Sequence, residues 1–263
     1  MPGPQTAAES RRTHTWSLGA VSFLNARPLL DGLDGDDAIR LRSAVPADLA
    51  GLFDRGEVDV AMLPVVDLHR AGGRLQIVSD GCIASESETL TVRVFSRMPP
   101  DRITHLHADP DSHTSIILAR VLWRELYHRS LQVVPWSPAT PPDDVDAVLL
   151  IGDKVVTAAP RGYGFEVDLG GAWHHLTGLP FVFAIWAGPA GRDFSELAAI
   201  LSAARDRGAA HSAEIAEELA RPHGWPPALA RRYLCETLRY KLTPEMHAGM
   251  AHFVGLARGQ GLL

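Results

Sequence analysis

The sequence predicts an α/β protein of two lobes, because short apolar strands alternate with helices along most of its 263 residues. Two longer strands stand out: "LTVRVFS" at residues 90–96 alternates cleanly, and "FVFAIWA" at residues 181–187 is almost wholly apolar. Between them lies a unit with strands and a helix of its own. We therefore expect two crossing strands that join the lobes, with a ligand cleft between the lobes.

The expected domain boundaries follow from these crossings. Lobe I comprises residues 16–92 and 187–263, and lobe II comprises residues 93–186. Residues 1–15 are expected to form a disordered tail, since they lack the apolar core of a signal peptide. No apolar run approaches the roughly 20 residues that span a bilayer. We expect a cytoplasmic protein with no membrane partner.

Composition narrows the classes of partner. Hydrophobic content of 46% and charged content of 21% are typical of a globular protein with a substantial core. The formal net charge is −6 and the basic residues are scattered, so a nucleic-acid partner is not expected. The two cysteines, Cys82 and Cys235, carry no motif, and nothing suggests a disulfide between them.

Lobe I begins with a strand at residues 18–21, and a second strand follows at residues 39–45. "PADLAGLFDRG", residues 46–56, predicts a helix with proline near its start and glycine as its stop. "VDVAMLP", residues 58–64, predicts a buried strand. The hydroxyl-rich residues 79–91, "SDGCIASESETLT", are equally consistent with a surface loop that turns on Gly81 and with part of a site.

Lobe II is expected to contain a helix at residues 113–128, strands at residues 103–108, 131–135 and 146–151, and the terminal stretch "FEVDLGGAWHHLTGLP". After residue 190 we expect helices only. Thr243-Pro244-Glu245 predicts the start of the last one, because a capping hydroxyl precedes proline and an acid. Met246, Met250, Phe253 and Leu256 continue it as an apolar stripe.

Three junctions place polar residues at strand ends, where ligands gather in folds of this kind. They hold Asn25, the run Ser112–Ser115, and Gly152-Asp153. The start of a helix can bind a carboxylate through free N–H groups and hydroxyls, without Lys or Arg. Asn25, Ser112 and Asp153 could equally be helix caps, and the sequence leaves both roles open.

The sequence contains no motif typical of metal binding, nucleotide binding or serine hydrolysis. His105 and His107 alternate on a strand, and His174-His175 are neighbours on a helix, so neither pair has metal-ligand spacing. We expect no metal site. Dinucleotide, P-loop and serine-hydrolase signatures are also missing from the sequence.

Six motifs together resemble one family. "VSFLNARPL", "RGEVDVAMLP", "SDGCIAS" with "LTVRVFS", "DSHTS", "LIGDKV" and "VDLGGAWHHLTGLPFVFAIWAG" stand in the order found in the chorismate dehydratases of the futalosine route to menaquinone. The resemblance covers roughly residues 16–190. Phe23 stands where the family often has tyrosine, so we expect no polar role there. Glu86-Ser87 follows Ser85 where the family often has glycine.

The resemblance implies a fold of the type II periplasmic binding proteins, with two α/β lobes around a cleft. It implies a lyase that converts chorismate to 3-[(1-carboxyvinyl)oxy]benzoate and water, with no cofactor. Chorismate is then the small-molecule partner.

From the resemblance and the strand ends, we expect Asn25 and Asp153 to be catalytic. The expected substrate-binding residues are Ser22, Ser85, Ser112, Thr114, Ser115 and Gly152. A neutral amide cannot act as a base near pH 7, so Asn25 is expected to orient and polarise the substrate. Either Asp153 or a carboxylate of chorismate accepts the proton, and the sequence does not decide between them.

Two other functions stay open. One is a non-catalytic binding protein for small carboxylates, which the missing signal peptide disfavours. The other is 1,4-dihydroxy-6-naphthoate synthase of the same pathway, which the N-terminal motif disfavours. The sequence does not indicate an oligomeric state.

Overall fold

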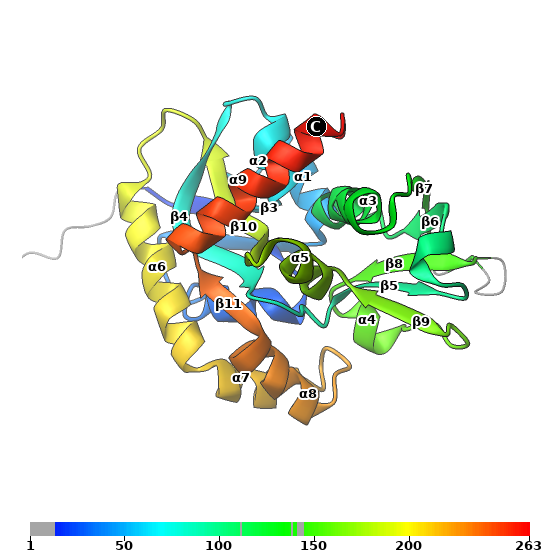
Figure 1. The fold of residues 1–263 in the computed structure, drawn as a ribbon. Helices are drawn as coiled ribbons and strands as arrows, with labels where there is room; N and C mark the ends of the chain where they lie inside the picture. Colours follow the sequence, from blue (N-terminus) through cyan, green and yellow to red (C-terminus); the bar gives the residue numbers. More distant parts are fainter. Residues whose placement is uncertain (1–13, 111, 138, 141–144) are drawn as a thin grey trace, which may run out of the picture.

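The computed structural model describes residues 14–110, 112–137, 139–140 and 145–263, which fold as two α/β lobes side by side (Figure 1). The larger lobe is built on a six-stranded sheet of order β11-β4-β10-β3-β1-β2, and the smaller on a five-stranded sheet of order β7-β6-β8-β5-β9. This confirms the predicted α/β class and its two lobes. The tail expected at residues 1–15 falls almost wholly outside the described residues.

The larger sheet combines strands from the start, middle and end of the chain. The first strands are parallel, with Leu18 opposite Leu41, whereas β10 runs antiparallel to both of its neighbours. Its strands are β1 (Trp16–Val21), β2 (Ile39–Ala44), β3 (Val60–Pro64), β4 (Leu75–Ser85), β10 (Phe181–Pro189) and β11 (Leu238–Lys241). The central strand β3 is buried along its whole length, which explains why its sequence is a continuous apolar run.

Helices cover this sheet and fill the C-terminal part of the chain. Helix α6 lies along its outer side and α9 crosses its front in Figure 1. The helices are η1 (Leu24–Leu30), α1 (Pro46–Asp54), α2 (Val65–Arg70), α6 (Ser195–Ala210), α7 (Ser212–Leu219), α8 (Pro227–Arg232), the π-helical turn η4 (Tyr233–Thr237) and α9 (Pro244–Gly259). The predicted start of α9 is confirmed, because the Thr243 hydroxyl accepts a hydrogen bond from the Met246 N–H at 3.3 Å.

The smaller lobe follows the predicted order of elements. Its members are β5 (Val92–Ser96), η2 (Pro100–Arg102), β6 (His105–Ala108), α3 (His113–Tyr127), β7 (Gln132–Pro135), β8 (Ala147–Ile151), α4 (Lys154–Thr157) and β9 (Phe165–Asp168). Strand β5 lies between β8 and β9 and is antiparallel to both. Helix α3 matches the helix expected at residues 113–128, and it buries its apolar face, including the fully buried Trp123.

The chain passes between the lobes in two short segments, residues 86–91 and residues 169–180, the second of which contains α5 (Leu169–Thr177). The expected crossing strands therefore lie at the ends of these segments, each within one sheet. On one side Phe181 pairs with Ser85, and on the other Arg93 pairs with Asp168. We propose that the domain boundaries fall within these two crossing segments.

Close packing holds the crossing segments together at Gly170. A Cβ atom there would lie 2.4 Å from the Thr89 Cγ2 atom and 2.5 Å from the Ser87 carbonyl oxygen. Only glycine lets the start of α5 approach the other segment this closely.

The structure corrects two expectations. Residues 79–85 belong to the buried strand β4, so Gly81 does not form a turn. The Trp186 ring packs over Gly81, and a Cβ atom there would lie 3.1 Å from this ring. The region after residue 190 is not purely helical, because β11 pairs with β4 at the sheet edge. Four residues are too few for a strand pattern to stand out among helices.

Both cysteines are free thiols. Cys82 is fully buried in β4, and burial raises the pKa of its thiol from 9.0 to about 12. Cys235 is exposed. The thiol of Cys82 therefore stays protonated and inert at neutral pH.

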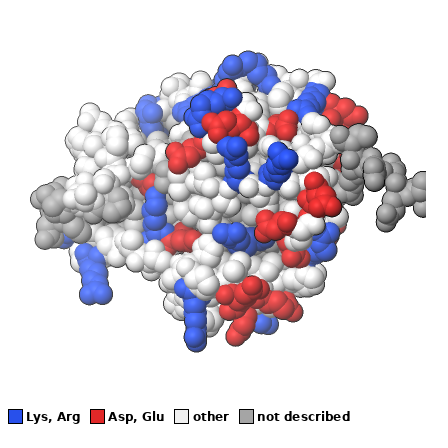
Figure 2. All heavy atoms as spheres, turned by 180° about the vertical axis from the view of Figure 1, so that it is seen from behind, with Lys and Arg blue, Asp and Glu red and all other residues white. Residues whose placement is uncertain are grey.

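Acidic and basic side chains are interspersed over the face seen in Figure 2. Exposed ion pairs such as Arg55 with Glu57, at 2.6 Å, contribute little stability. Among the described residues, no helix is both long and apolar enough to span a membrane.

We predict that Gly170→Ala destabilises the protein by about 1–3 kcal/mol, because the added methyl group overpacks the crossing segments. Gly171→Ala is the matched control, since a Cβ there would make its nearest contact at 3.4 Å, with the Glu88 Cγ atom. Urea denaturation measures both. Equal stabilities of the two variants would contradict the packing account.

Candidate functional site

A cavity that is partly open to solvent lies between the lobes. Most of its wall is apolar, with aromatic rings from Phe23 and Phe183. Its polar residues are Asn25, Thr89, Thr91, Ser112, His113, Thr114, Ser115 and Tyr233. None of the described residues that line it is Asp, Glu, Lys or Arg. A ligand in this cavity therefore meets neutral hydrogen-bonding groups on an apolar wall.

The N-terminus of α3 forms one wall. Ser112 is buried, and its hydroxyl makes no capping bond and has no partner. The Thr114 hydroxyl accepts a hydrogen bond from the Val66 N–H at 3.3 Å and lies 3.4 Å from the Phe183 carbonyl, to which it donates. Ser115 is also buried at this wall. The helix start thus faces the cavity while it contacts the larger lobe.

A second contact across the lobes involves His113, whose ring nitrogen lies 2.8 Å from a carboxylate oxygen of Asp67 in α2. His113 lines the cavity, and Asp67 holds its ring in place. The start of α3 therefore touches the larger lobe at two consecutive residues.

Asn25 lies within η1 and is not its cap, because that position belongs to Phe23. Its carboxamide oxygen is buried and has no hydrogen-bond partner. A buried polar atom without a partner in a cavity wall is well placed to bind a ligand.

Gly152 also lines the cavity, and its backbone φ of +60° favours glycine. A Cβ there would lie 2.5 Å from the Phe23 ring. The Phe23 ring thus packs directly on the Gly152 backbone. This contact is apolar, in agreement with the expectation that Phe23 has no polar role.

Asp153 does not line the cavity. Its carboxylate accepts hydrogen bonds from the Leu24 N–H at 3.2 Å, from His223 at 2.8 Å and from the Trp225 indole at 2.9 Å. It follows β8 in the smaller lobe, whereas all three donors belong to the larger lobe. Asp153 therefore joins the lobes, and its side chain makes no capping bond to α4.

Two more expected binding residues, Ser22 and Ser85, lie outside the cavity wall. The Ser85 hydroxyl is fully buried and donates to the Ser87 carbonyl at 3.1 Å. Ser22 is half-buried, and its backbone N–H donates to the Ala44 carbonyl at 3.0 Å.

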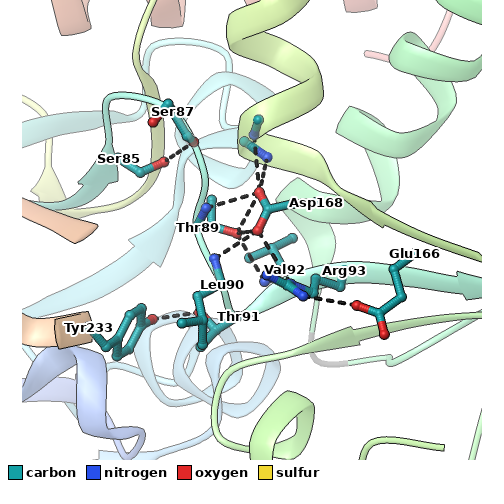
Figure 3. A network of polar contacts seen from close by, with 12 residues as sticks. Ser85, Ser87, Thr89, Leu90, Thr91, Val92, Arg93, Glu166, Asp168 and Tyr233 are labelled. Carbon is teal, nitrogen blue, oxygen red and sulfur yellow. Dashed lines mark hydrogen bonds and ion pairs between the residues drawn. The ribbon is translucent and has the colours of Figure 1, made fainter. Parts of the chain in front are cut away.

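Three hydroxyl residues of the cavity wall were not among the expected site residues, namely Thr89, Thr91 and Tyr233. The Tyr233 hydroxyl lies 2.5 Å from the Thr91 hydroxyl, and both side chains are buried (Figure 3). Burial raises the pKa of Tyr233 above its ordinary value, so the phenol stays neutral at pH 7. Thr91 belongs to the hydroxyl-rich residues 79–91, whereas no sequence motif marked Tyr233, which follows a short helix, as a site residue.

The Asp168 carboxylate binds both crossing segments (Figure 3). It accepts hydrogen bonds from the N–H groups of Thr89 at 2.9 Å and Leu90 at 2.8 Å, and from those of Gly170 at 3.1 Å and Gly171 at 3.0 Å. Leu90 has a φ of +65°, a strained value for a residue other than glycine. The carboxylate thus holds a strained turn whose neighbours Thr89 and Thr91 line the cavity.

In the described part of the chain, no three side chains of His, Cys, Asp or Glu gather as a metal site.

We predict that Asp168→Ala lowers the free energy of unfolding by about 1–3 kcal/mol, because it leaves several backbone N–H groups without an acceptor. Glu166→Ala in the same strand is the control, since the exposed pair of Glu166 with Arg93 contributes at most about 1 kcal/mol. Chemical denaturation of both variants tests this, and a loss no larger for Asp168→Ala would contradict it.

Comparison with known proteins identifies relatives over nearly the whole chain. A family model described as Menaquinone biosynthesis matches residues 16–259. A chorismate dehydratase from Thermus thermophilus is 29% identical over 261 residues, which cover 90% of this chain and 93% of that protein.

Solved structures show the fold alone. A protein from Archaeoglobus fulgidus matches with a TM-score of 0.75 at 15% identity, over 96% of this chain and 100% of that one. The alkanesulfonate-binding protein of Xanthomonas axonopodis pv. citri, bound to MOPS, matches with a TM-score of 0.66 at 16% identity, over 97% and 96%. A Candida albicans protein with the generic periplasmic binding protein fold has a TM-score of 0.59 at 11% identity, over 95% and 90%. The expected periplasmic-binding-protein-like fold is confirmed.

Proposed function

The chain belongs to the menaquinone biosynthesis family, and we propose that it is a chorismate dehydratase. The reaction removes the C4 hydroxyl and the C3 hydrogen of chorismate and yields 3-[(1-carboxyvinyl)oxy]benzoate and water. The observation that carries the proposal is the cavity between the lobes, where a hydroxyl-rich helix start faces a carboxamide oxygen without a partner. The choice of chorismate as the substrate rests on the similarity to the chorismate dehydratase of Thermus thermophilus.

The start of α3 is the proposed carboxylate site. A 15-residue helix presents free N–H groups and the positive end of its dipole at this terminus. The Ser112 and Ser115 hydroxyls add donors beside them. Charge-assisted hydrogen bonds of this kind can hold a carboxylate without a cationic side chain. Thr114, whose hydroxyl contacts the larger lobe, positions the helix for this role.

Asn25 is the proposed orienting group. Its amide is neutral and cannot remove a proton near pH 7. A fixed hydrogen bond from the reacting part of the substrate can hold the C3–H and C4–O bonds in the geometry for elimination. Closure of the lobes around the substrate excludes water while this happens.

The proposed proton acceptor is a carboxylate of chorismate itself. Asp153 is not among the residues that line the cavity, and its carboxylate already accepts hydrogen bonds from three donors. In the proposed step, the C3 proton moves to the substrate carboxylate and the C3–H electron pair forms the new ring double bond. The C4–O bond breaks, and the departing oxygen leaves with a proton as water. Formation of the aromatic ring drives the reaction.

The proposal includes a cytoplasmic location and a small-molecule partner, with no part for nucleic acid. Two free thiols agree with a reducing compartment.

Incubation of the purified protein with chorismate tests the function. We expect consumption of chorismate and formation of the aromatic enol ether, measured by chromatography and mass spectrometry. Binding without product would contradict the proposal and favour a binding protein. Conversion of cyclic dehypoxanthinylfutalosine in place of chorismate would favour the naphthoate synthase.

Two variants separate the roles of Asn25 and Asp153. We predict that Asn25→Ala still binds chorismate but lowers kcat by about 100-fold or more, because it removes a preorganised hydrogen bond. Asp153→Asn should keep kcat within about tenfold, whereas loss of a general base costs about 10²–10⁴-fold. Steady-state kinetics decide the matter. Unchanged turnover in Asn25→Ala, or near-complete loss in Asp153→Asn, would reverse the assignment.

A further inference from the structure

Tyr233 begins the single π-helical turn between α8 and β11, and its side chain is 1% exposed. Its ring stacks on Trp225, with centroids 4.9 Å apart and planes 16° from parallel. Single π-helical turns are rare and occur frequently at functional sites. The hydroxyl of this anchored ring reaches the cavity, where Asn25 and Thr91 lie.

The hydroxyl of Tyr233 has two polar partners. It lies 2.5 Å from the Thr91 hydroxyl, and the Asn25 side chain also forms a hydrogen bond with it. Burial raises the pKa of Tyr233, and the bonds from Thr91 and Asn25 lower it in part. The Asn25 Oδ1 atom has no hydrogen-bond partner, so the atom of Asn25 that bonds to Tyr233 is its amide nitrogen. An amide nitrogen only donates, and the Tyr233 oxygen therefore accepts this bond.

This bond decides which atom of Asn25 faces a ligand. With the amide nitrogen committed to Tyr233, the buried and unpartnered Oδ1 atom is the one left for the cavity. A carboxamide oxygen only accepts hydrogen bonds. It therefore binds a hydroxyl group and repels a carboxylate.

The same arrangement directs Thr91. Either hydroxyl of the Thr91–Tyr233 pair could donate, but the Asn25 amide nitrogen cannot accept the Tyr233 proton. The Tyr233 proton is satisfied when it is donated to the Thr91 oxygen, and the Thr91 proton is then left to point elsewhere. Thr91 lines the cavity, so this proton can be donated to a ligand. Hydrogen bonds in such a chain strengthen one another.

We propose that Tyr233 is a positioning residue that turns the Asn25 carboxamide oxygen and the Thr91 hydroxyl proton toward the cavity, as a matched acceptor and donor for one hydroxyl group of the ligand. If the ligand is chorismate, this is the C4 hydroxyl, and to that extent the inference rests on the proposed function. The Thr91 hydroxyl then donates a hydrogen bond that assists departure of the C4 hydroxyl, while the Asn25 oxygen accepts from this hydroxyl and fixes its orientation.

Asn25 is the only asparagine in the sequence, so its side chain can be observed alone. A sample labelled with ¹⁵N in the asparagine side chain gives one pair of amide proton signals. We expect one of these protons to exchange slowly with solvent, because it is bonded to Tyr233. Tyr233→Phe keeps the ring that stacks on Trp225 but removes the oxygen, so the pair should shift and lose its protection.

Tyr240→Phe is the matched control, since the Tyr240 hydroxyl is buried and has no partner. It should leave the amide signals and kcat unchanged. Amide signals that are the same in Tyr233→Phe as in the unaltered protein would overturn the inference, whatever the enzyme activity.

Kinetics supply the second readout. We expect Tyr233→Phe and Thr91→Val each to lower kcat on chorismate by about tenfold to a hundredfold, with a much smaller change in KM. The double variant should be no slower than the slower single variant, because the two hydroxyls act as one chain. Additive losses, or a lowered melting temperature with unchanged kcat, would overturn the inference. If the unaltered protein leaves chorismate unconverted, the proposed function fails, and the amide signals still decide the role of Tyr233.

Discussion

The carboxylate of Asp168 is the contact on which the two-lobed arrangement depends. It accepts N–H groups from both segments that connect the lobes, and it holds Leu90 in a conformation that a leucine rarely adopts. Gly170 lets those segments touch. Because Thr89 and Thr91 lie in one of them, the same contact places their side chains in the cavity wall. A change at Asp168 therefore affects the connection between the lobes and the site together.

The cavity combines neutral polar groups with an apolar wall, which suits a reaction governed by orientation. Chorismate carries two negative charges, and the described lining residues include no Lys or Arg to meet them. Helix N–H groups and hydroxyls replace the cations, and they are fixed before the substrate arrives. Contacts of Asp153 and of the His113–Asp67 pair join the lobes around this space.

The sequence predicted the α/β class, the order of most elements and five of the lining residues, because strand ends and helix starts carry clear local signals. Asn25, Ser112, Thr114, Ser115 and Gly152 lie together as expected. Contacts between distant residues were not predictable. Asp153 stands at a strand end like the others, yet its side chain turns to donors about 70 residues away. Tyr233 reaches the cavity only through the π-helical turn, and β11 is too short to show a strand pattern.

A crystal structure of the protein with 3-[(1-carboxyvinyl)oxy]benzoate bound tests the central claim most directly, namely that the cavity between the lobes is the site of dehydration without a carboxylate base from the protein. The account predicts one product carboxylate at the start of α3 and the ring carbon that lost the hydroxyl beside Asn25. It also predicts that no Asp or Glu oxygen lies within hydrogen-bond distance of the carbon that lost its proton. Product bound outside this cavity, or an enzyme carboxylate at that carbon, would contradict it.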